Sequence, residues 1–251
     1  MEDRLRQRVE ELIVILLEAS GMTGVKAWAM EIAFLYATAR APEANKAEVW
    51  QHIKQAYVRH VRDSFPDQED PSQSFRRASG DAFEGFVEEY LNSSGSLMSA
   101  GIRAVRLRGE DFERLKKALG LERELRPKDV DLFLQGVDRE GRPRIFGALF
   151  PKVSYAERIR ADEGASRALM SKGLWSATVT LDSRNELGRE ARPSVKRDTI
   201  NRGGFAGCYS LNRETQAGGC IHYVDVRVSG HANPLFRDIV AAWKSYQESN
   251  P

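Results

Sequence analysis

Hydrophobic residues in the first quarter of the chain recur at helical spacing. Residues 2–19 place apolar side chains every three or four positions, which predicts a helix that ends at Gly21. Residues 25–39 and 46–62 repeat this pattern, and Pro42 lies in the break between them. The front of the chain is therefore expected to consist of helices.

A polar, proline-bearing stretch follows these helices. The sequence FPDQEDPSQS at residues 65–74 is the best candidate for a junction between two parts of the chain. We therefore expect an N-terminal helical subdomain at residues 1–70 and a second part at residues 71–251. The second part opens with a helix at residues 79–92, for which Ser79 is the predicted N-cap.

Beyond residue 100 the hydrophobic pattern alternates between strand and helix periods. Two adjacent runs over residues 130–150 read as strands joined by a turn near residues 138–141. The remaining predicted elements are a strand at 102–107, a helix at 111–119, a helix from Ser154 to Leu174, a strand at 176–181, a basic glycine-containing region at 192–211, a strand at 220–230 and a helix at 234–246. This order predicts an α/β fold behind the helical front section.

Composition adds few constraints to this picture. A chain of 251 residues with 41% hydrophobic residues can bury a substantial core. The apolar run at residues 11–20 is too short to span a bilayer, and no signal-peptide pattern is present, so we expect a cytoplasmic protein with no membrane partner. The net charge of +2 balances many charges of both signs and does not by itself indicate a nucleic-acid partner.

The common sulfur and nucleotide motifs are missing from the sequence. Cys208 and Cys220 have no CxxC partner and no histidine at metal-ligand spacing, so a zinc site is not indicated. Reduced thiols are the simplest interpretation, and a disulfide stays open. The histidines form no ligand pattern, and there is no Walker-type or Rossmann glycine motif.

The paired strands carry one lysine and one carboxylate that could meet. Asp131 lies in the first predicted strand, and Lys152 follows the second. Such a pair suits phosphodiester hydrolysis, because the carboxylate can hold a divalent metal while the lysine orients water and stabilises charge on phosphorus. Many metal nucleases place a second acid two residues before the lysine, but this chain has Phe150 there. The following helix offers three acids: Glu157, Asp162 and Glu163.

Structural interpretations of the same residues remain open at this point. Ser154 and Glu157 have the spacing of a capping box, which would satisfy free amides at a helix start. Arg158 and Asp162 are four residues apart and could form a surface ion pair worth only a few tenths of a kcal/mol. Asp131 could equally be a charge at a strand edge.

A basic cluster lies further along the chain. Its cations outnumber its three acids and stand among glycine and asparagine residues, which would suit a segment that follows a phosphate backbone. A solvated loop explains the composition nearly as well. The cations are Arg184, Arg189, Arg192, Lys196, Arg197, Arg202 and Arg213.

Four segments together resemble a known family. They are DPSQSFRRASGDAFEGFVEEY at 70–90, KDVDLF at 128–133, KVSYAERIRADEGASRALMSKGLWSATVTLD at 152–182 and RPSVKR at 192–197. The chain resembles the type II restriction endonucleases that cut hexanucleotide sites with a central CCGG, the group typified by AgeI and BsaWI. The resemblance covers roughly the last two thirds of the chain, and the KVSxAER motif followed by an acid is its most specific part.

The resemblance implies a fold and a set of catalytic residues. The fold would be a PD-(D/E)xK nuclease core, a mixed central sheet flanked by helices. Asp131 and Asp162 would be the catalytic carboxylates that hold Mg²⁺, and Lys152 would be the catalytic lysine. Glu163, next to Asp162, is the alternative ligand, since a change of one residue in helix phase would exchange the two. Glu84 could support the metal site.

The resemblance also implies residues that contact double-stranded DNA. Glu157 and Arg158 resemble the family's base-reading pair, because a carboxylate can accept from cytosine N4 and an arginine can span guanine O6 and N7. Arg77, Lys196 and Arg197 are further candidate DNA contacts.

The expected activity is Mg²⁺-dependent cleavage of both DNA strands by a homodimer or a higher oligomer. The site would be a palindrome with a central CCGG, cut after the first of six bases to leave 5′ four-base overhangs. Two alternatives are kept: a sequence-specific DNA-binding protein on an inactive nuclease fold, and a structure-specific DNA repair nuclease.

Overall fold

The computed structural model describes residues 3–19, 26–64, 70–126, 128–155 and 159–250. The chain groups into two compact units, Met1–Val87 and Glu88–Pro251. The change of unit therefore falls inside one long helix, whereas the predicted boundary at residue 70 lies where that helix starts. Among the described residues, no helix combines the length and apolar character needed to cross a membrane.

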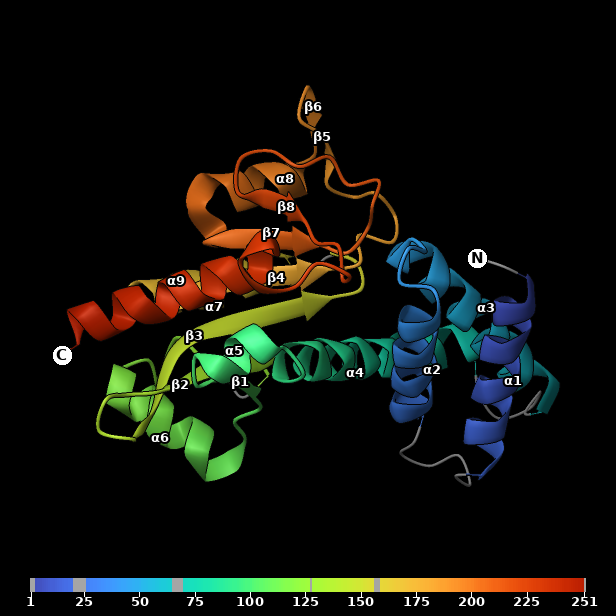
Figure 1. The fold of residues 1–251 in the computed structure, drawn as a ribbon, viewed down its shortest axis with the longest axis horizontal. Coiled ribbons are helices and arrows are strands. Elements are labelled where there is room, and N and C mark those ends of the chain that lie inside the picture. Colours follow the sequence, from blue (N-terminus) through green and yellow to red (C-terminus); the bar gives the residue numbers. More distant parts are fainter. Residues whose placement is uncertain (1–2, 20–25, 65–69, 127, 156–158, 251) are drawn as a thin grey trace. The chain divides into compact units, whose positions relative to one another are not determined.

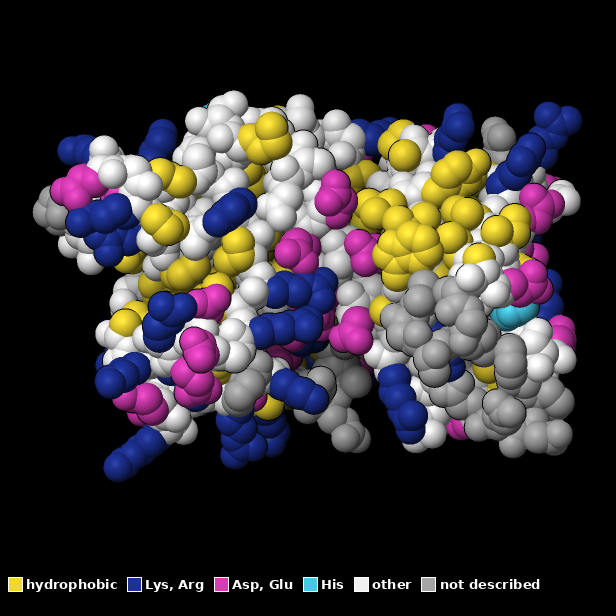
Figure 2. All heavy atoms as spheres, turned by 90° about the horizontal axis from the view of Figure 1, so that it is seen from below, with side chains coloured by type: hydrophobic (Ala, Val, Ile, Leu, Met, Phe, Trp, Pro, Cys, Tyr) yellow, Lys and Arg dark blue, Asp and Glu magenta, His cyan; other side chains and the backbone are white. Residues whose placement is uncertain are grey.

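The first unit is built from helices (Figure 1). They are α1 (Asp3–Ala19), α2 (Lys26–Arg40), α3 (Lys46–Ser64) and most of α4 (Pro71–Asn92). The three predicted front helices are confirmed to within two residues at each end. Aromatic rings fill the centre of this unit, with Phe34 edge-on to Trp50 at 5.0 Å and to Phe86 at 4.5 Å between centroids. Figure 2 shows hydrophobic side chains gathered on one face of this unit, at the right of the view.

Helix α4 starts eight residues before the predicted N-cap. The Asp70 side chain accepts hydrogen bonds from the backbone N–H groups of Ser72 and Gln73, and Pro71 occupies the first helical position. Ser79 lies inside the helix, where its hydroxyl donates to the Arg76 carbonyl at 3.1 Å. The prediction of Ser79 as a cap was therefore wrong, because Pro71 starts this helix and does not break the chain.

The second unit contains a six-stranded mixed sheet in the order β1-β2-β3-β4-β7-β8. Pairing is antiparallel from β1 to β3 and parallel from β3 to β8. The strands are β1 (Ile102–Val105), β2 (Leu132–Val137), β3 (Pro143–Lys152), β4 (Trp175–Thr180), β7 (Gly207–Ser210) and β8 (Ile221–Tyr223). A separate hairpin is formed by β5 (Gly188–Arg189) and β6 (Arg192–Pro193).

Helices flank this sheet and connect its strands, as predicted (Figure 1). They are α5 (Gly95–Ser99), α6 (Gly109–Leu119), α7 (Ile159–Met170), α8 (Val195–Thr199), the π-helix η1 (Ile200–Gly204), the 3-10 helix η2 (Gly230–Ala232) and α9 (Pro234–Ser249). The region at 192–211, predicted to be loose, instead holds β6, α8, η1 and β7. The predicted strand at 220–230 is shorter and ends at Tyr223.

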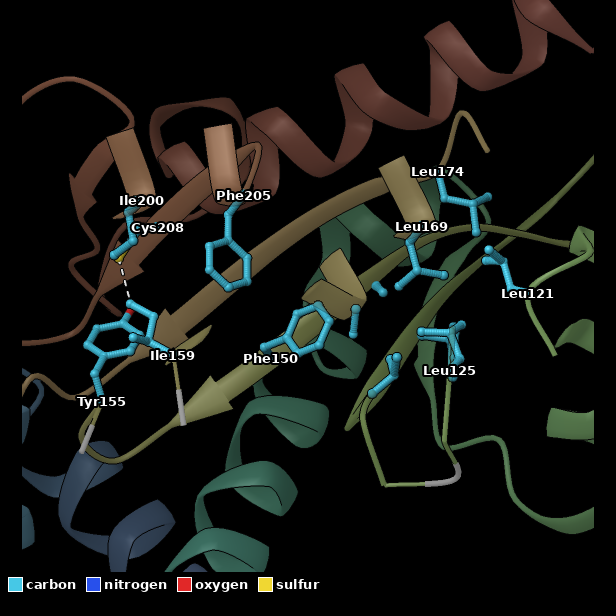
Figure 3. Close-up of a cluster of buried hydrophobic side chains, with 14 of the residues drawn as sticks. Leu121, Leu125, Phe150, Tyr155, Ile159, Leu169, Leu174, Ile200, Phe205 and Cys208 are labelled. Carbon is cyan, nitrogen blue, oxygen red and sulfur yellow. Dashed lines mark hydrogen bonds between the residues drawn. The ribbon is translucent and has the colours of Figure 1, made fainter. Parts of the chain in front are cut away.

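A β-bulge in β3 decides which side chains face which helix. The register with β2 skips Phe146, which is the extra residue between Ile145 and Gly147. Phe146 packs against Trp243 of α9 at 5.0 Å between ring centroids. Beyond the bulge, Ala148 and Phe150 join the hydrophobic cluster that includes Leu169 of α7 (Figure 3). Because side chains alternate along a strand, Lys152 emerges on the same face as Phe150, toward α7.

Candidate active site

Lys152 and Asp131 meet at one end of the sheet. Lys152 is the last residue of β3, and Asp131 directly precedes β2, whose Leu132 pairs with Leu149. The Lys152 Nζ donates a hydrogen bond to Asp131 Oδ2 at 2.5 Å, and the two side chains are 14% and 13% exposed. The pair is therefore a charge-assisted contact that is largely, but not fully, shielded from water.

Helix α7 brings a second carboxylate to the same lysine. Asp162 Oδ2 lies 3.7 Å from Lys152 Nζ, and the Asp162 side chain is 13% exposed. Ile159, Ser166 and Leu169 follow the same spacing of three and four residues and are buried. Ser166 accepts a hydrogen bond from Ser176 of β4 at 2.7 Å. Asp162 is therefore on the helix face that packs on the sheet.

Glu163 points elsewhere. Its Oε1 accepts a hydrogen bond from Arg167 Nε at 2.9 Å, one helical turn further along. A Cβ placed on Gly204 would lie 3.0 Å from Glu163 Cγ, so the Glu163 side chain runs beside η1. One residue corresponds to about 100° around a helix, which separates the directions of the two acids. The structure thus brings Asp162, and not Glu163, to Lys152.

The donor set around Lys152 suits a hard divalent cation. Two carboxylates around one ammonium leave a net negative charge, and Mg²⁺ is commonly held by one or two carboxylates with water and phosphate oxygens completing its shell. Across the described residues, no group of three or more His, Cys, Asp or Glu side chains is placed to hold a metal ion. The protein's own contribution at this point would be Asp131 and Asp162.

The segment after Lys152 is anchored at Tyr155. The Tyr155 hydroxyl lies 3.1 Å from Cys208 Sγ and 3.3 Å from Thr178 Oγ1 in the core (Figure 3). Burial raises the pKa of Tyr155 well above its usual value and that of Cys208 to about 12, so both groups are neutral at physiological pH. Cys208 is therefore a packing residue, not a nucleophile. Both cysteines are free thiols. Glu157 and Arg158, two and three residues after Tyr155, lie outside the described residues.

Glu186 is a positioning residue that the sequence did not indicate. Its Oε2 accepts the backbone N–H of Tyr155 at 2.7 Å, and its Oε1 accepts from Lys196 Nζ at 2.6 Å. Lys196, predicted to contact DNA, is therefore half-buried in an ion pair. Because Glu186 and Tyr155 are 31 residues apart, no local spacing pattern could have linked them.

Arg197, which the resemblance suggests as a DNA contact, is buried. Its side chain is 1% exposed, and it donates hydrogen bonds to the backbone carbonyls of Leu187 and Gln216. In this structure it joins two loops from inside the protein. Arg77 and Glu84 lie on α4 in the first unit, where Arg77 is exposed and Glu84 half-buried. Their predicted roles stay predictions.

The chain is similar to known proteins in both sequence and fold. The chain is 35% identical over 203 residues to the type II restriction enzyme AgeI of Thalassovita gelatinovora, covering 73% of this chain and 70% of that protein. The solved structure of a specific AgeI–DNA complex matches with a TM-score of 0.81 and 29% identity, over 96% of this chain and 92% of that chain. This match confirms the predicted fold class, a restriction-endonuclease-like mixed sheet flanked by helices with an N-terminal helical part.

A second solved structure is more remote. A pre-specific BsaWI–DNA complex matches with a TM-score of 0.49 and 17% identity, over 99% of this chain and 96% of that chain. No protein-family model matches the chain.

Proposed function

Because the chain belongs to the AgeI-like type II restriction endonucleases, site-specific deoxyribonucleases, we propose that it cleaves both strands of a DNA palindrome with a central CCGG, using Mg²⁺. The observation that carries the proposal is the cluster at the end of β3. Lys152 lies 2.5 Å from one carboxylate and 3.7 Å from another, in a chain of this family. That cluster provides the charges that phosphodiester hydrolysis requires.

Each residue of the cluster has a separate proposed task. Asp131 and Asp162 would hold Mg²⁺, which as a Lewis acid supplies charge stabilisation at the phosphate. Lys152 would donate hydrogen bonds to the scissile phosphate and to the attacking water, and it would stabilise charge as it builds on phosphorus. In the reaction one bond from the water oxygen to phosphorus forms, and one bridging phosphorus–oxygen bond breaks. The attacking water gives up a proton to solvent, and the leaving oxygen takes up a proton to become a hydroxyl.

We assign base reading to Glu157 and Arg158. A carboxylate accepting from cytosine N4 and an arginine spanning guanine O6 and N7 would read a C·G pair in the major groove. Tyr155, the last described residue before them, follows Lys152 by three residues and is fixed by its hydroxyl and its backbone N–H, which supports placing base reading in this part of the chain. Two subunits related by two-fold symmetry would read the two halves of CCGG.

The proposed assembly follows from the palindrome, and the proposed cut position follows from likeness to the CCGG group. The part of the chain that the structure describes holds one such cluster, which suits one strand, so a homodimer is the smallest assembly that would cut both strands. By likeness to the CCGG group, the cut would follow the first base of a six-base site and leave 5′ overhangs of four bases.

A plasmid digest with sequenced ends tests the proposed function. We expect cuts only at CCGG-containing palindromes in Mg²⁺, no cuts in EDTA, and loss of cutting in Asp131→Asn. Asp129→Asn is the matched control, because Asp129 accepts the Arg126 backbone N–H at 2.7 Å. Specific binding without cutting would identify an inactive DNA-binding protein, and cuts unrelated to CCGG would identify a structure-specific nuclease.

A further inference from the structure

The β5–β6 hairpin stands out from the second unit at the top of Figure 1. It is short, with Gly188 opposite Pro193 and Arg189 opposite Arg192. Gly188 has φ 65°, and a Cβ there would lie 3.2 Å from the Arg192 carbonyl oxygen, so glycine permits this pairing. The turn residues are Glu190 and Ala191.

Contacts from neighbouring segments hold the hairpin in place. The Glu190 backbone N–H donates to the Gln216 side chain at 3.0 Å. Buried Arg197 donates to the carbonyls of Leu187, at the hairpin's base, and of Gln216. The Asp182 carboxylate accepts the backbone N–H of Glu186 at 2.6 Å, ahead of the hairpin. The hairpin is thus an ordered projection and not only a solvated loop.

The hairpin carries two arginines on its paired residues and a single acid, Glu190, in its turn. Arg189 and Arg192 are exposed and directly opposite each other, and like charges in that position repel. In the described part of the chain, neither arginine has an ion pair. The Glu190 carboxylate lies beside Gly218, on another loop. An anion bound by both arginines would relieve this repulsion.

The segment that leads to the hairpin leaves the six-stranded sheet beside the catalytic cluster. Lys152 pairs with Thr180, and Thr180 pairs with Ser210, so three parallel strands end at one level. The Leu181 backbone N–H donates to the Lys152 carbonyl at 3.1 Å where the chain leaves β4 toward the hairpin. The segment that carries the hairpin therefore begins in contact with the catalytic lysine.

We propose that the β5–β6 hairpin binds the phosphate backbone of the bound duplex, with Arg189 and Arg192 each contacting a phosphate. The proposal rests on the proposed function, because it requires a duplex at the cluster. Phosphate contacts orient a protein on DNA and carry no base information. The hairpin therefore adds affinity and register, and sequence discrimination is left to other residues.

The test is the salt dependence of duplex binding in an Asp131→Asn background, which keeps the DNA intact. The slope of log K against log salt is negative, and each lost phosphate contact should reduce its magnitude by about 0.9, so Arg189→Ala with Arg192→Ala should reduce it by about 1.8. Affinity should fall equally for a CCGG duplex and a scrambled duplex. Arg189→Lys with Arg192→Lys should retain the slope, which separates charge from folding.

Arg139→Ala is the matched control. Arg139 is exposed in the β2–β3 turn, at the end of β3 opposite Lys152, and its replacement should leave the slope unchanged. An unchanged slope in the double alanine variant would overturn the proposal, and a loss of dimer mass in that variant would point to a subunit interface instead. A loss confined to the CCGG duplex would also overturn it. Failure of the proposed function would show separately: the Asp131→Asn protein with both hairpin arginines intact would then bind the CCGG duplex and the scrambled duplex with equal affinity.

Discussion

At the scale of single residues, the two neighbouring acids of α7 have different partners. Asp162 faces Lys152, whereas Glu163 faces Arg167. If Asp162 holds the metal, Asp162→Asn should remove several kcal/mol of transition-state stabilisation and lower kcat by about 1,000-fold. Glu163→Gln should stay within a few-fold of the parent protein. Single-turnover cleavage of a CCGG duplex in Mg²⁺ measures both, and equal losses in the two variants would contradict the assignment.

Base reading by Glu157 and Arg158 is a second residue-scale prediction. Replacing either with alanine should lower discrimination between CCGG and a single-base variant by about 1 to 3 kcal/mol, because one base contact is lost. Competitive binding to the two duplexes measures this difference. Arg160→Ala, an exposed arginine in the first turn of α7, serves as the control. A lower melting temperature with unchanged base preference would show that Glu157 is only a helix cap.

The meeting of Asp131 and Lys152 could be predicted from the sequence, because it depends on local patterns. The turn at 138–141 fixes which strands pair, and pairing then brings the strand ends together. Arg197 could not be predicted in this way. Nothing in RPSVKR shows that this arginine turns inward, since one of its acceptors, the Gln216 carbonyl, lies on a loop 19 residues away.

At the scale of elements, the segment after β3 depends on the loop after β4. Glu186 accepts the Tyr155 N–H, and removing it leaves that N–H and Lys196 unpaired. Glu186→Ala should therefore weaken CCGG discrimination by up to about 1.5 to 3 kcal/mol, the scale of a hydrogen bond to a charged group. Glu214→Ala is the control, because Glu214 is an exposed acid that accepts from Asn185. Unchanged discrimination in Glu186→Ala would show that Tyr155 is held by its hydroxyl alone.

Short buried strands were the hardest elements to predict. The four residues of β7 are all buried, so they show no alternation, and glycines surround them. The length of β8 is set by the length of β7. The apolar alternation of residues 220–230 continues past Tyr223, but the last pair is Ser210 with Tyr223, because β7 ends there. The length of a strand is thus set by its partner, which a local pattern does not contain.

At the scale of the whole molecule, total charge gives no indication of DNA binding. The chain has 38 basic and 36 acidic residues, and Figure 2 shows both signs spread over the surface in view. Binding must then depend on local arrangements, such as the hairpin arginines and the negative cluster that would bind Mg²⁺. Within the described residues each of these arrangements occurs once, so a palindromic duplex would need two chains to be contacted symmetrically.

Mixing subunits tests whether two chains act on one site. If each cluster cuts one strand, a dimer of one parent subunit and one Asp131→Asn subunit can only nick the duplex. With a several-fold excess of Asp131→Asn, supercoiled plasmid should give mainly open circles, whereas the same excess of Asp129→Asn should give linear DNA. Gel analysis of early time points separates these products. Linear DNA as the first product at every ratio would show that one subunit cuts both strands, and the proposed homodimer mechanism would have to be abandoned.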